Sequence, residues 1–240
     1  MRTMLEIPES ATIARQIDQT LRGRTIQHVQ AAHSPHGFAW YFGDPAAYPD
    51  LLTGRSISEA RPLAGQVEIL LEDSSITLSD GVNIRYLEPG RPHPEKHQLL
   101  LALEDGSALV CTVQMYGGIM AFPTGTNENP YYLVSKTKPS PLTEGFTKAY
   151  FDQIAQEAGP KRSLKGLLAT EQRIPGLGNG CLQDILFHAK LYPQTKVEAL
   201  SEADMDRLYH RIKDTLAAMT EAGGRDTEKD LFGRPGGYRT

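Results

Sequence analysis

Apolar residues recur at a helical spacing near the N-terminus and in short, strand-like runs after it. Between Pro8 and Arg22 they recur about every 3.6 positions, and Gly23 ends the run, which predicts an amphipathic helix. From Thr25 to about Phe122 the apolar runs are short, and clusters of Gly, Pro and Asp separate them. Short apolar runs separated by turn residues predict an antiparallel β-sandwich or β-barrel. The expected strands include Gln66–Leu71, Ser75–Leu78, Leu99–Leu103 and Ala108–Val113, with turns at Asp73-Ser74, Asp80-Gly81 and Asp105-Gly106.

Helical spacing returns in the second half of the chain. A polar, proline-containing stretch from Thr124 to Pro141 comes first, and we expect it to link two domains. The expected helices after it are Tyr150–Glu157, Leu164–Thr170, Gly180–Ala189 and Ser201–Ala222. The pattern therefore predicts an α+β protein, with an N-terminal helix and antiparallel β-sandwich over residues 1–130 and a helical domain over residues 131–240.

The composition is that of a globular protein that buries a core, because 40% of the residues are hydrophobic and 22% are charged. No apolar run is long enough to cross a membrane, and the first ten residues lack the apolar segment of a signal peptide. Cys111 and Cys181, the only cysteines, make neither a disulfide framework nor a four-cysteine zinc site. These features predict a reduced, cytoplasmic protein.

The charge is uneven along the chain, whose net charge is −4. Residues 1–134 carry 9 basic and 15 acidic side chains, whereas residues 135–240 carry 16 basic and 14 acidic ones. A polyanion is therefore expected to bind only a local basic surface, most readily in the C-terminal half. The acidic residues Asp226, Glu228 and Asp230 alternate with basic ones, which is typical of a solvated segment.

The most informative segment is the glycine-bracketed bend from Pro175 to Gly180. Gly176 and Gly178 allow the backbone to approach a ligand closely, and free N–H groups at the start of the next helix favour an anion such as a DNA phosphate. Asn179 adds a side-chain amide donor. Taken alone, this bend is also typical of an ordinary helix–helix connection.

The surrounding residues give the bend a wider context. Ile185-Leu186-Phe187, Ala189 and Pro193 follow it, and helical segments flank it from Lys161 to Gly224. This stretch resembles the helix–two-turn–helix signature of the formamidopyrimidine-DNA glycosylase/endonuclease VIII family. The resemblance implies a nucleoid-associated monomer that binds damaged double-stranded DNA, does not bind a membrane and needs no cofactor. The DNA contacts that it implies are Lys165, Asn179, Gly176 and Gly178.

The N-terminus matches this family except at its nucleophile. The family begins Met-Pro-Glu-Leu-Pro-Glu and uses the amine of the proline, whereas this chain reads Met4-Leu5-Glu6-Ile7-Pro8-Glu9. The resemblance makes Glu6 the proton-transfer group. The amide nitrogen of an internal Leu5 is not nucleophilic, so a reactive amine is expected at Met4 if the chain starts there rather than at Met1.

Three further positions depart from the family. Gln66 follows Gly65 where the family has a lysine, and Met115 and Tyr116 stand where it has arginines that probe the strand opposite the lesion. Either side chain could wedge into a base stack, or belong to the core at a strand end. The cysteines of the family's zinc finger are absent, so either the lineage lacks the finger or the chain stops before it, and no metal is expected in this chain.

Three functions are compatible with this sequence. The first is a DNA glycosylase and abasic-site lyase that acts on a flipped-out damaged base. The second is an inactive relative that binds damaged or bent DNA without cleaving it. The third is a cytosolic enzyme that binds a small phosphorylated substrate at the same bend.

Overall fold

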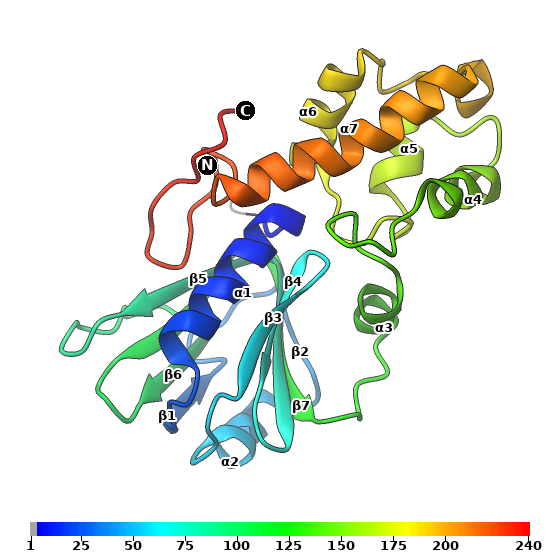
Figure 1. Cartoon of the computed structure of the whole chain (residues 1–240). Coiled ribbons are helices and arrows are strands. Elements are labelled where there is room, and N and C mark those ends of the chain that lie inside the picture. The colour runs from blue at the N-terminus through cyan, green and yellow to red at the C-terminus, as the bar shows by residue number, and fades with distance from the viewer. Residues whose placement is uncertain (1–3) are drawn as a thin grey trace.

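The computed structural model describes residues 4–240. Met1, the alternative start of the chain, therefore lies outside the described residues. The strands are β1 (Ile26–Ala31), β2 (Ala39–Tyr41), β3 (Glu59–Leu63), β4 (Gln66–Leu70), β5 (Ser74–Leu87), β6 (Leu99–Leu103) and β7 (Ala108–Pro123). The helices are α1 (Ile7–Leu21), α2 (Tyr48–Leu52), α3 (Pro130–Thr137), α4 (Lys148–Ala158), α5 (Leu164–Ala169), α6 (Asn179–Ala189) and α7 (Glu202–Glu221). Figure 1 shows the strands together with α1 in one part of the molecule and α4 to α7 in the other. No helix within residues 4–240 has the length and apolar character needed to span a bilayer.

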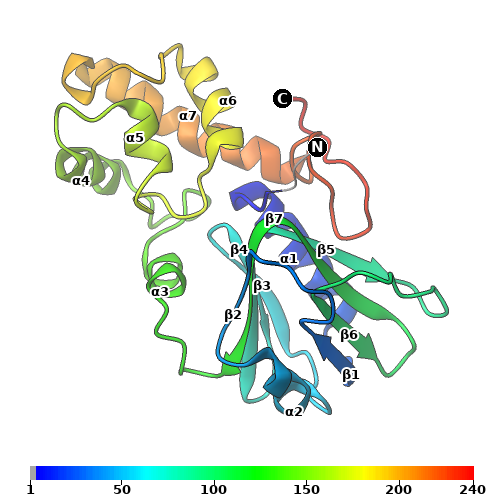
Figure 2. The same ribbon diagram turned by 180° about the vertical axis from the view of Figure 1, so that it is seen from behind.

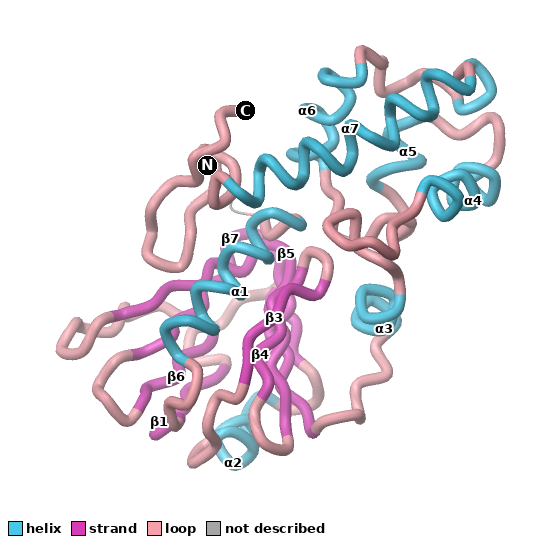
Figure 3. Tube along the Cα trace, viewed as in Figure 1, coloured by secondary structure: helices cyan, strands magenta, loops and turns pink. Residues whose placement is uncertain are grey.

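The strands form one continuous sheet in the order β1-β6-β7-β5-β4-β3, and β2 pairs with β7 in parallel. Figure 3 shows the strands, in magenta, gathered in one part of the molecule beside α1. All the other strand pairs are antiparallel, as predicted. The two long strands, β5 and β7, pair along their whole length, from Ser74 opposite Pro123 to Leu87 opposite Ala108. They lie at the centre of the sheet, between β1-β6 on one side and β4-β3 on the other.

The turn predicted at Asp80-Gly81 is wrong, because both residues lie inside β5. Asp80 has a left-handed backbone with φ of 57°, and the pairing with β7 shifts register between Asp80 and Val82. A bulge and a tight turn favour the same residues, since both need a backbone conformation that Asp and Gly adopt readily. Here the bulge bends the strand without ending it.

Helix α1 covers the sheet because its apolar residues face one side. Ile13, Ile17 and Leu21 are buried and pack with side chains from β1, β4, β5, β6 and β7 in one core. A second core joins α4, α5, α6 and α7, and it includes Ile7 from the start of α1. Leu5, two residues earlier, belongs to the first core. The N-terminal segment therefore contributes to both cores.

A helix lies within the stretch that the sequence predicts to be a linker. Asn129 caps α3 by accepting a hydrogen bond from Tyr131 N at 2.9 Å, and Pro130 is its first residue. An Asn cap followed by Pro is a helix start signal. The polar composition of the surrounding stretch favoured its interpretation as a linker. Tyr132 packs on Phe122 of β7, which fixes α3 to the sheet. The division at residue 130 remains a prediction.

After α7 the chain turns back to the β-domain (Figure 2). Leu231 is buried in the first core, and its carbonyl accepts a hydrogen bond from Tyr86 N at 3.0 Å. The prediction of a solvated segment is wrong for Glu228, of which only 7% is exposed. Arg225 is also buried, at 3% exposure. This returning segment brings a cation and a carboxylate beside the start of α1.

Candidate functional site

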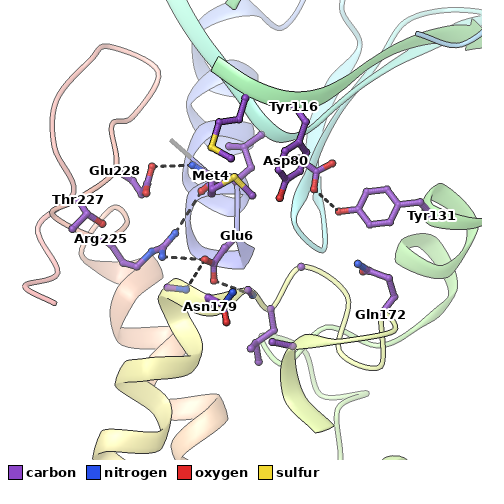
Figure 4. Close-up of a pocket in the computed structure, with 17 residues that line it drawn as sticks. Met4, Glu6, Asp80, Tyr116, Tyr131, Gln172, Asn179, Arg225, Thr227 and Glu228 are labelled. Atoms are coloured by element: carbon purple, nitrogen blue, oxygen red, sulfur yellow. Dashed lines mark hydrogen bonds and ion pairs between the residues drawn. The ribbon is translucent and has the colours of Figure 1, made fainter. Parts of the chain in front are cut away.

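A cavity of about 640 Å³ lies where the β-domain, the bend before α6 and the returning C-terminal segment meet (Figure 4). The polar and charged side chains that line it come from distant parts of the chain; they are Glu6, Asp80, Tyr116, Tyr131, Gln172, Asn179, Arg225, Thr227 and Glu228. Met4, Leu5 and Met115 add apolar surface. The cavity thus combines acidic groups, hydroxyls and an arginine in one space.

The carboxylate of Glu6 occupies the N-terminus of α6. It accepts hydrogen bonds from Gly178 N at 2.9 Å, Gly180 N at 2.9 Å and Cys181 N at 3.0 Å. Positive helix termini favour such an anion. The N–H groups that the sequence analysis assigned to an external phosphate are therefore taken by the protein's own carboxylate. Gly178 is required for this contact, because a Cβ there would lie 2.7 Å from Glu6 Cδ.

The other glycine of the bend packs against the β-domain. Gly176 has φ of 77°, and its carbonyl accepts a hydrogen bond from Ile7 N at 3.0 Å. It meets Gly65, in the β3–β4 turn, so closely that a Cβ on Gly65 would lie 2.7 Å from Gly176 Cα. In this structure Gly176 joins the two parts of the molecule backbone to backbone.

Arg225 forms ion pairs with both glutamates of the N-terminal segment. Its Nη1 donates to Glu6 Oε1 at 3.1 Å, its Nη2 to Glu9 Oε2 at 2.8 Å and its Nε to Glu9 Oε1 at 3.0 Å. Burial favours the neutral guanidine, but the hydrogen bond and charge of Glu9 outweigh it and raise the pKa of Arg225. Two buried carboxylates and one buried cation therefore form a hydrogen-bonded group.

Glu228 lies beside Met4, and its Oε2 accepts a hydrogen bond from Met4 N at 3.2 Å. Burial raises the pKa of Glu228 to about 7, and the positive charge of Arg225 opposes this rise. Met4 itself is partly buried and lines the cavity. Sequence analysis missed Glu228 and Arg225 because their partners are more than 200 positions away.

Leu5, at the position of the family's nucleophile, is held by its backbone. Its amide N donates to the carbonyl oxygen of Asp80 at 2.8 Å, and only 5% of the residue is exposed. The lone pair of an amide nitrogen is delocalised into the neighbouring carbonyl group, so it is not nucleophilic. The Leu5 nitrogen is in addition held by its hydrogen bond to Asp80.

Asp80 extends its carboxyl into the cavity between two tyrosines (Figure 4). Its Oδ1 accepts a hydrogen bond from the Tyr131 hydroxyl at 3.3 Å, and its Oδ2 from Ser79 Oγ at 3.0 Å. Burial raises the pKa of Asp80, and the hydrogen bonds from Ser79 and Tyr131 partly offset that rise. Burial and the nearby Asp80 charge raise the pKa of Tyr131. The sequence pattern indicated Asp80 only as a turn residue.

The predicted nucleic-acid contacts lie at the rim. Asn179 and Lys165 are exposed, and together they line a shallow depression that adjoins the cavity at Asn179. Met115 is 36% exposed, and Tyr116 lies with its ring centroid 5.8 Å from that of Trp40, itself 49% exposed. Asn179, Met115 and Tyr116 thus line the cavity, and Lys165 lies in the adjoining depression.

Gln66, where the family has a lysine, faces inward. It is 2% exposed, and its Nε2 donates to Ser135 Oγ at 3.0 Å and to the Tyr131 carbonyl at 3.3 Å. This side chain therefore anchors α3 and is not available to a phosphate. Within residues 4–240 no group of three or more His, Cys, Asp and Glu side chains is placed to hold a metal ion. Cys111 and Cys181 are both buried, and burial raises the pKa of each thiol.

Comparison with known proteins gives this architecture a context. The model of the formamidopyrimidine-DNA glycosylase H2TH domain matches residues 138–230. Formamidopyrimidine-DNA glycosylase from Lactobacillus gasseri is 25% identical over 98% of this chain and 85% of its own length. The protein of that name from Bacillus subtilis is 26% identical over 92% of this chain and 79% of its own length.

Solved structures agree over nearly the whole chain. The MutM (Fpg) protein of Thermus thermophilus superposes with a TM-score of 0.78 and 25% identity, covering 97% of this chain and 84% of that one. Lactococcus lactis Fpg, in a complex with DNA containing an abasic site, gives a TM-score of 0.80 at 20% identity, covering 96% and 84%. The fold, the helix–two-turn–helix segment and these relatives agree: the chain is similar over nearly its whole length to members of the formamidopyrimidine-DNA glycosylase/endonuclease VIII family.

Proposed function

We propose that this protein is a DNA glycosylase of base-excision repair, which binds damaged double-stranded DNA and removes the damaged base. The cavity carries the proposal, because it lies between the two parts of the fold and gathers Glu6, Asp80 and Asn179 beside the family's DNA-binding turn. Relatives across nearly the full length are named formamidopyrimidine-DNA glycosylase. A base flipped out of the duplex is the substrate that such a recess accommodates.

Lys165 and Asn179 are the proposed contacts to the DNA backbone. Both are exposed, and no salt bridge to Lys165 is found among residues 4–240. A free cation and a side-chain amide suit phosphate oxygens, which supply most contacts in protein–DNA complexes. Met115 and Tyr116 are the proposed wedge, since partly exposed apolar and aromatic groups can replace the stacking of an extruded base.

Glu6 acts in this proposal as a positioning residue. Three backbone amides and Arg225 donate to its two oxygens, so few lone pairs remain to accept a proton. The carboxylate instead ties α1 to α6 and shapes the cavity wall. The family resemblance implies a proton-transfer role for Glu6, and that role would require one of these hydrogen bonds to break first.

A lyase step needs an amine, and in a chain that starts at Met4 a free α-amine would line the cavity. Trapping with borohydride on abasic-site DNA tests this role of Met4. The assay compares a chain that starts at Met1 with one that starts at Met4. A covalent adduct only with the second chain would assign the lyase amine to Met4, and no adduct with either would remove the lyase activity from the proposal.

The decisive experiment measures release of free base from duplexes that carry a formamidopyrimidine, an oxidised pyrimidine or no lesion. We expect release from a damaged duplex only, and binding that weakens as salt increases, because Lys165 displaces counterions. The same affinity for all three duplexes, together with no released base, would refute the proposal.

One observation favours the second candidate, an inactive DNA-binding relative: the nitrogen of Leu5 is an amide held by Asp80 O at 2.8 Å. That candidate predicts preferential binding of damaged duplex without base release. The third candidate, an enzyme for a small phosphorylated substrate, has no free phosphate site at the bend. The amides of the bend that would bind the phosphate are occupied by Glu6.

A further inference from the structure

The cavity contains one carboxyl group that the proposed function has not used. Asp80 lines the same space as Met4 and Tyr116, and the bulge in β5 directs it there. A non-glycine residue at φ of 57° inside a long strand costs free energy, and such conformations cluster at functional sites. The left-handed backbone at the bulge therefore sets the direction of the Asp80 side chain.

The surroundings of Asp80 suit a group that accepts a proton. Its two hydrogen bonds come from neutral hydroxyls, Ser79 Oγ at 3.0 Å and Tyr131 OH at 3.3 Å, and no cation pairs with it among the described residues. Each oxygen keeps a lone pair for a water molecule in the cavity. Glu6, by contrast, is held by three amides and the guanidinium of Arg225.

The donor to Asp80 is itself held firmly. Tyr131 lies on α3, where its carbonyl accepts a hydrogen bond from Gln66 Nε2 at 3.3 Å. The next residue, Tyr132, donates to the buried carboxylate of Glu68 at 2.8 Å. Two buried polar contacts from β4 thus fix the helix that presents Tyr131 to Asp80.

We propose that Asp80 is the general base that activates a water molecule for hydrolysis of the N-glycosidic bond, so that this enzyme removes the base without forming a covalent adduct and leaves the strand uncut. The inference deepens the proposed glycosylase function and rests on it. It replaces the missing amine at Leu5 with water as the nucleophile.

Hydrolysis by this route conserves atoms and charge. The water oxygen forms a bond to C1′ of the flipped nucleotide while one of its protons passes to a carboxylate oxygen of Asp80. The C1′–N bond breaks, and its electron pair stays on the nitrogen of the departing base, which takes a proton from solvent. Asp80 then releases its proton to solvent. The products are a free base and an abasic sugar with a hydroxyl on C1′.

The test uses the full chain and a damaged duplex from which the protein releases a base, and it measures base release and strand nicking separately. Asp80→Asn is the main variant, because Asn also tolerates the left-handed backbone and keeps the hydrogen-bonding shape. Asp73→Asn, at the exposed start of β5, is the matched control. DNA affinity and thermal unfolding of both variants show whether they fold and bind.

We expect the wild type to release base without nicking and without a borohydride adduct. Asp80→Asn should lower kcat at least about 100-fold with little change in DNA affinity, the loss typical of a removed general base. Tyr131→Phe removes a hydrogen bond that favours the ionised carboxylate, so it should move the acidic limb of the pH–rate profile to higher pH. Asp73→Asn should behave as the wild type.

Two results would overturn the role of Asp80 and leave the glycosylase standing. One is base release by Asp80→Asn within about threefold of the wild type, far less than loss of a general base causes. The other is a trapped covalent adduct that accumulates as fast as the base is released. If the wild type binds DNA but releases no base from any of the duplexes, the glycosylase proposal fails together with this inference.

Discussion

Arg225 donates from Nη1 to Oε1 of Glu6 across 3.1 Å, and the side chains of both residues are less than a tenth exposed. The same guanidinium also binds Glu9, so two buried carboxylates share one cation. Removal of one partner from a buried ion pair leaves an uncompensated charge, which costs more than the pair itself contributes.

Arg225→Met should therefore lower the free energy of unfolding by about 3–5 kcal/mol, because Glu6 and Glu9 would lose their cation. Denaturant unfolding monitored by circular dichroism measures this loss. Arg211→Met, which removes an exposed cation from α7, is the control and should change stability by less than about 1 kcal/mol. Equal losses in the two variants would contradict the structural role of Arg225.

Gly176→Ala should destabilise the joint between the two parts of the molecule. Its φ of 77° disfavours a side chain, and an added Cβ would collide with the backbone of Gly65. We expect a loss of at least about 2 kcal/mol in unfolding free energy. Gly37→Ala is the control, because nothing lies within 4 Å of its added Cβ and it is exposed. A Gly176→Ala protein as stable as this control would refute the close contact.

Lys165→Gln should weaken binding to damaged DNA. It should also reduce the slope of log K against log salt concentration by about one unit, which is the change expected for one lost phosphate contact. Fluorescence anisotropy at several salt concentrations measures both. Lys213→Gln removes the same charge from α7, where the lysine donates to the Thr143 carbonyl at 3.2 Å. An identical salt slope in both variants would remove Lys165 from the interface.

Glu228 should make stability depend on pH. Its pKa is about 7 in the folded protein against an ordinary value of 4.5, so between these values the folded state binds more protons than the unfolded state. Stability therefore falls as pH rises from 4.5 through 7. Glu228→Gln removes this ionisation, and we expect it to be roughly 1–2 kcal/mol more stable than the wild type at about pH 8, with the partial hydration of the site taken into account.

The difference between Glu228→Gln and the wild type should vanish towards about pH 5, where the wild-type carboxyl is protonated. Thermal melts at intervals between about pH 5 and pH 8 give the comparison. Glu221→Gln at the exposed end of α7 is the control and should leave the pH profile unchanged. A Glu228→Gln profile parallel to that of the wild type would show that Glu228 does not titrate in this range.

Local patterns predicted those elements whose ends carry a clear signal. The strand Leu99–Leu103 was predicted with its observed bounds, because a turn at Asp105-Gly106 ends it. The strands β5 and β7 are longer than predicted, since they continue through Asp80-Gly81 and Gly117-Gly118, residues that usually end a strand. Pairing between the two strands overrides that local preference.

The site was predictable only in part. Glu6 and Asn179 stand in motifs, so their positions could be recognised from neighbouring residues. Arg225 and Glu228 stand in a segment of alternating charges, and what distinguishes them is contact with residues at the opposite end of the chain. A local sequence pattern cannot predict contacts between residues so far apart in the chain. Asp80 was missed for a different reason, because a bulge and a turn use the same residue types.

The partners Glu6 and Arg225 are 219 positions apart in the chain. During synthesis the N-terminal segment leaves the ribosome long before its counter-ion exists, and loops of this length close slowly. The β-domain therefore has to fold around a segment whose two glutamates are still without their cation. The cavity takes its final form only when the residues from Arg225 onwards arrive, so a chain that ends before Arg225 leaves Glu6 and Glu9 without their cation and lacks Leu231 from the first core.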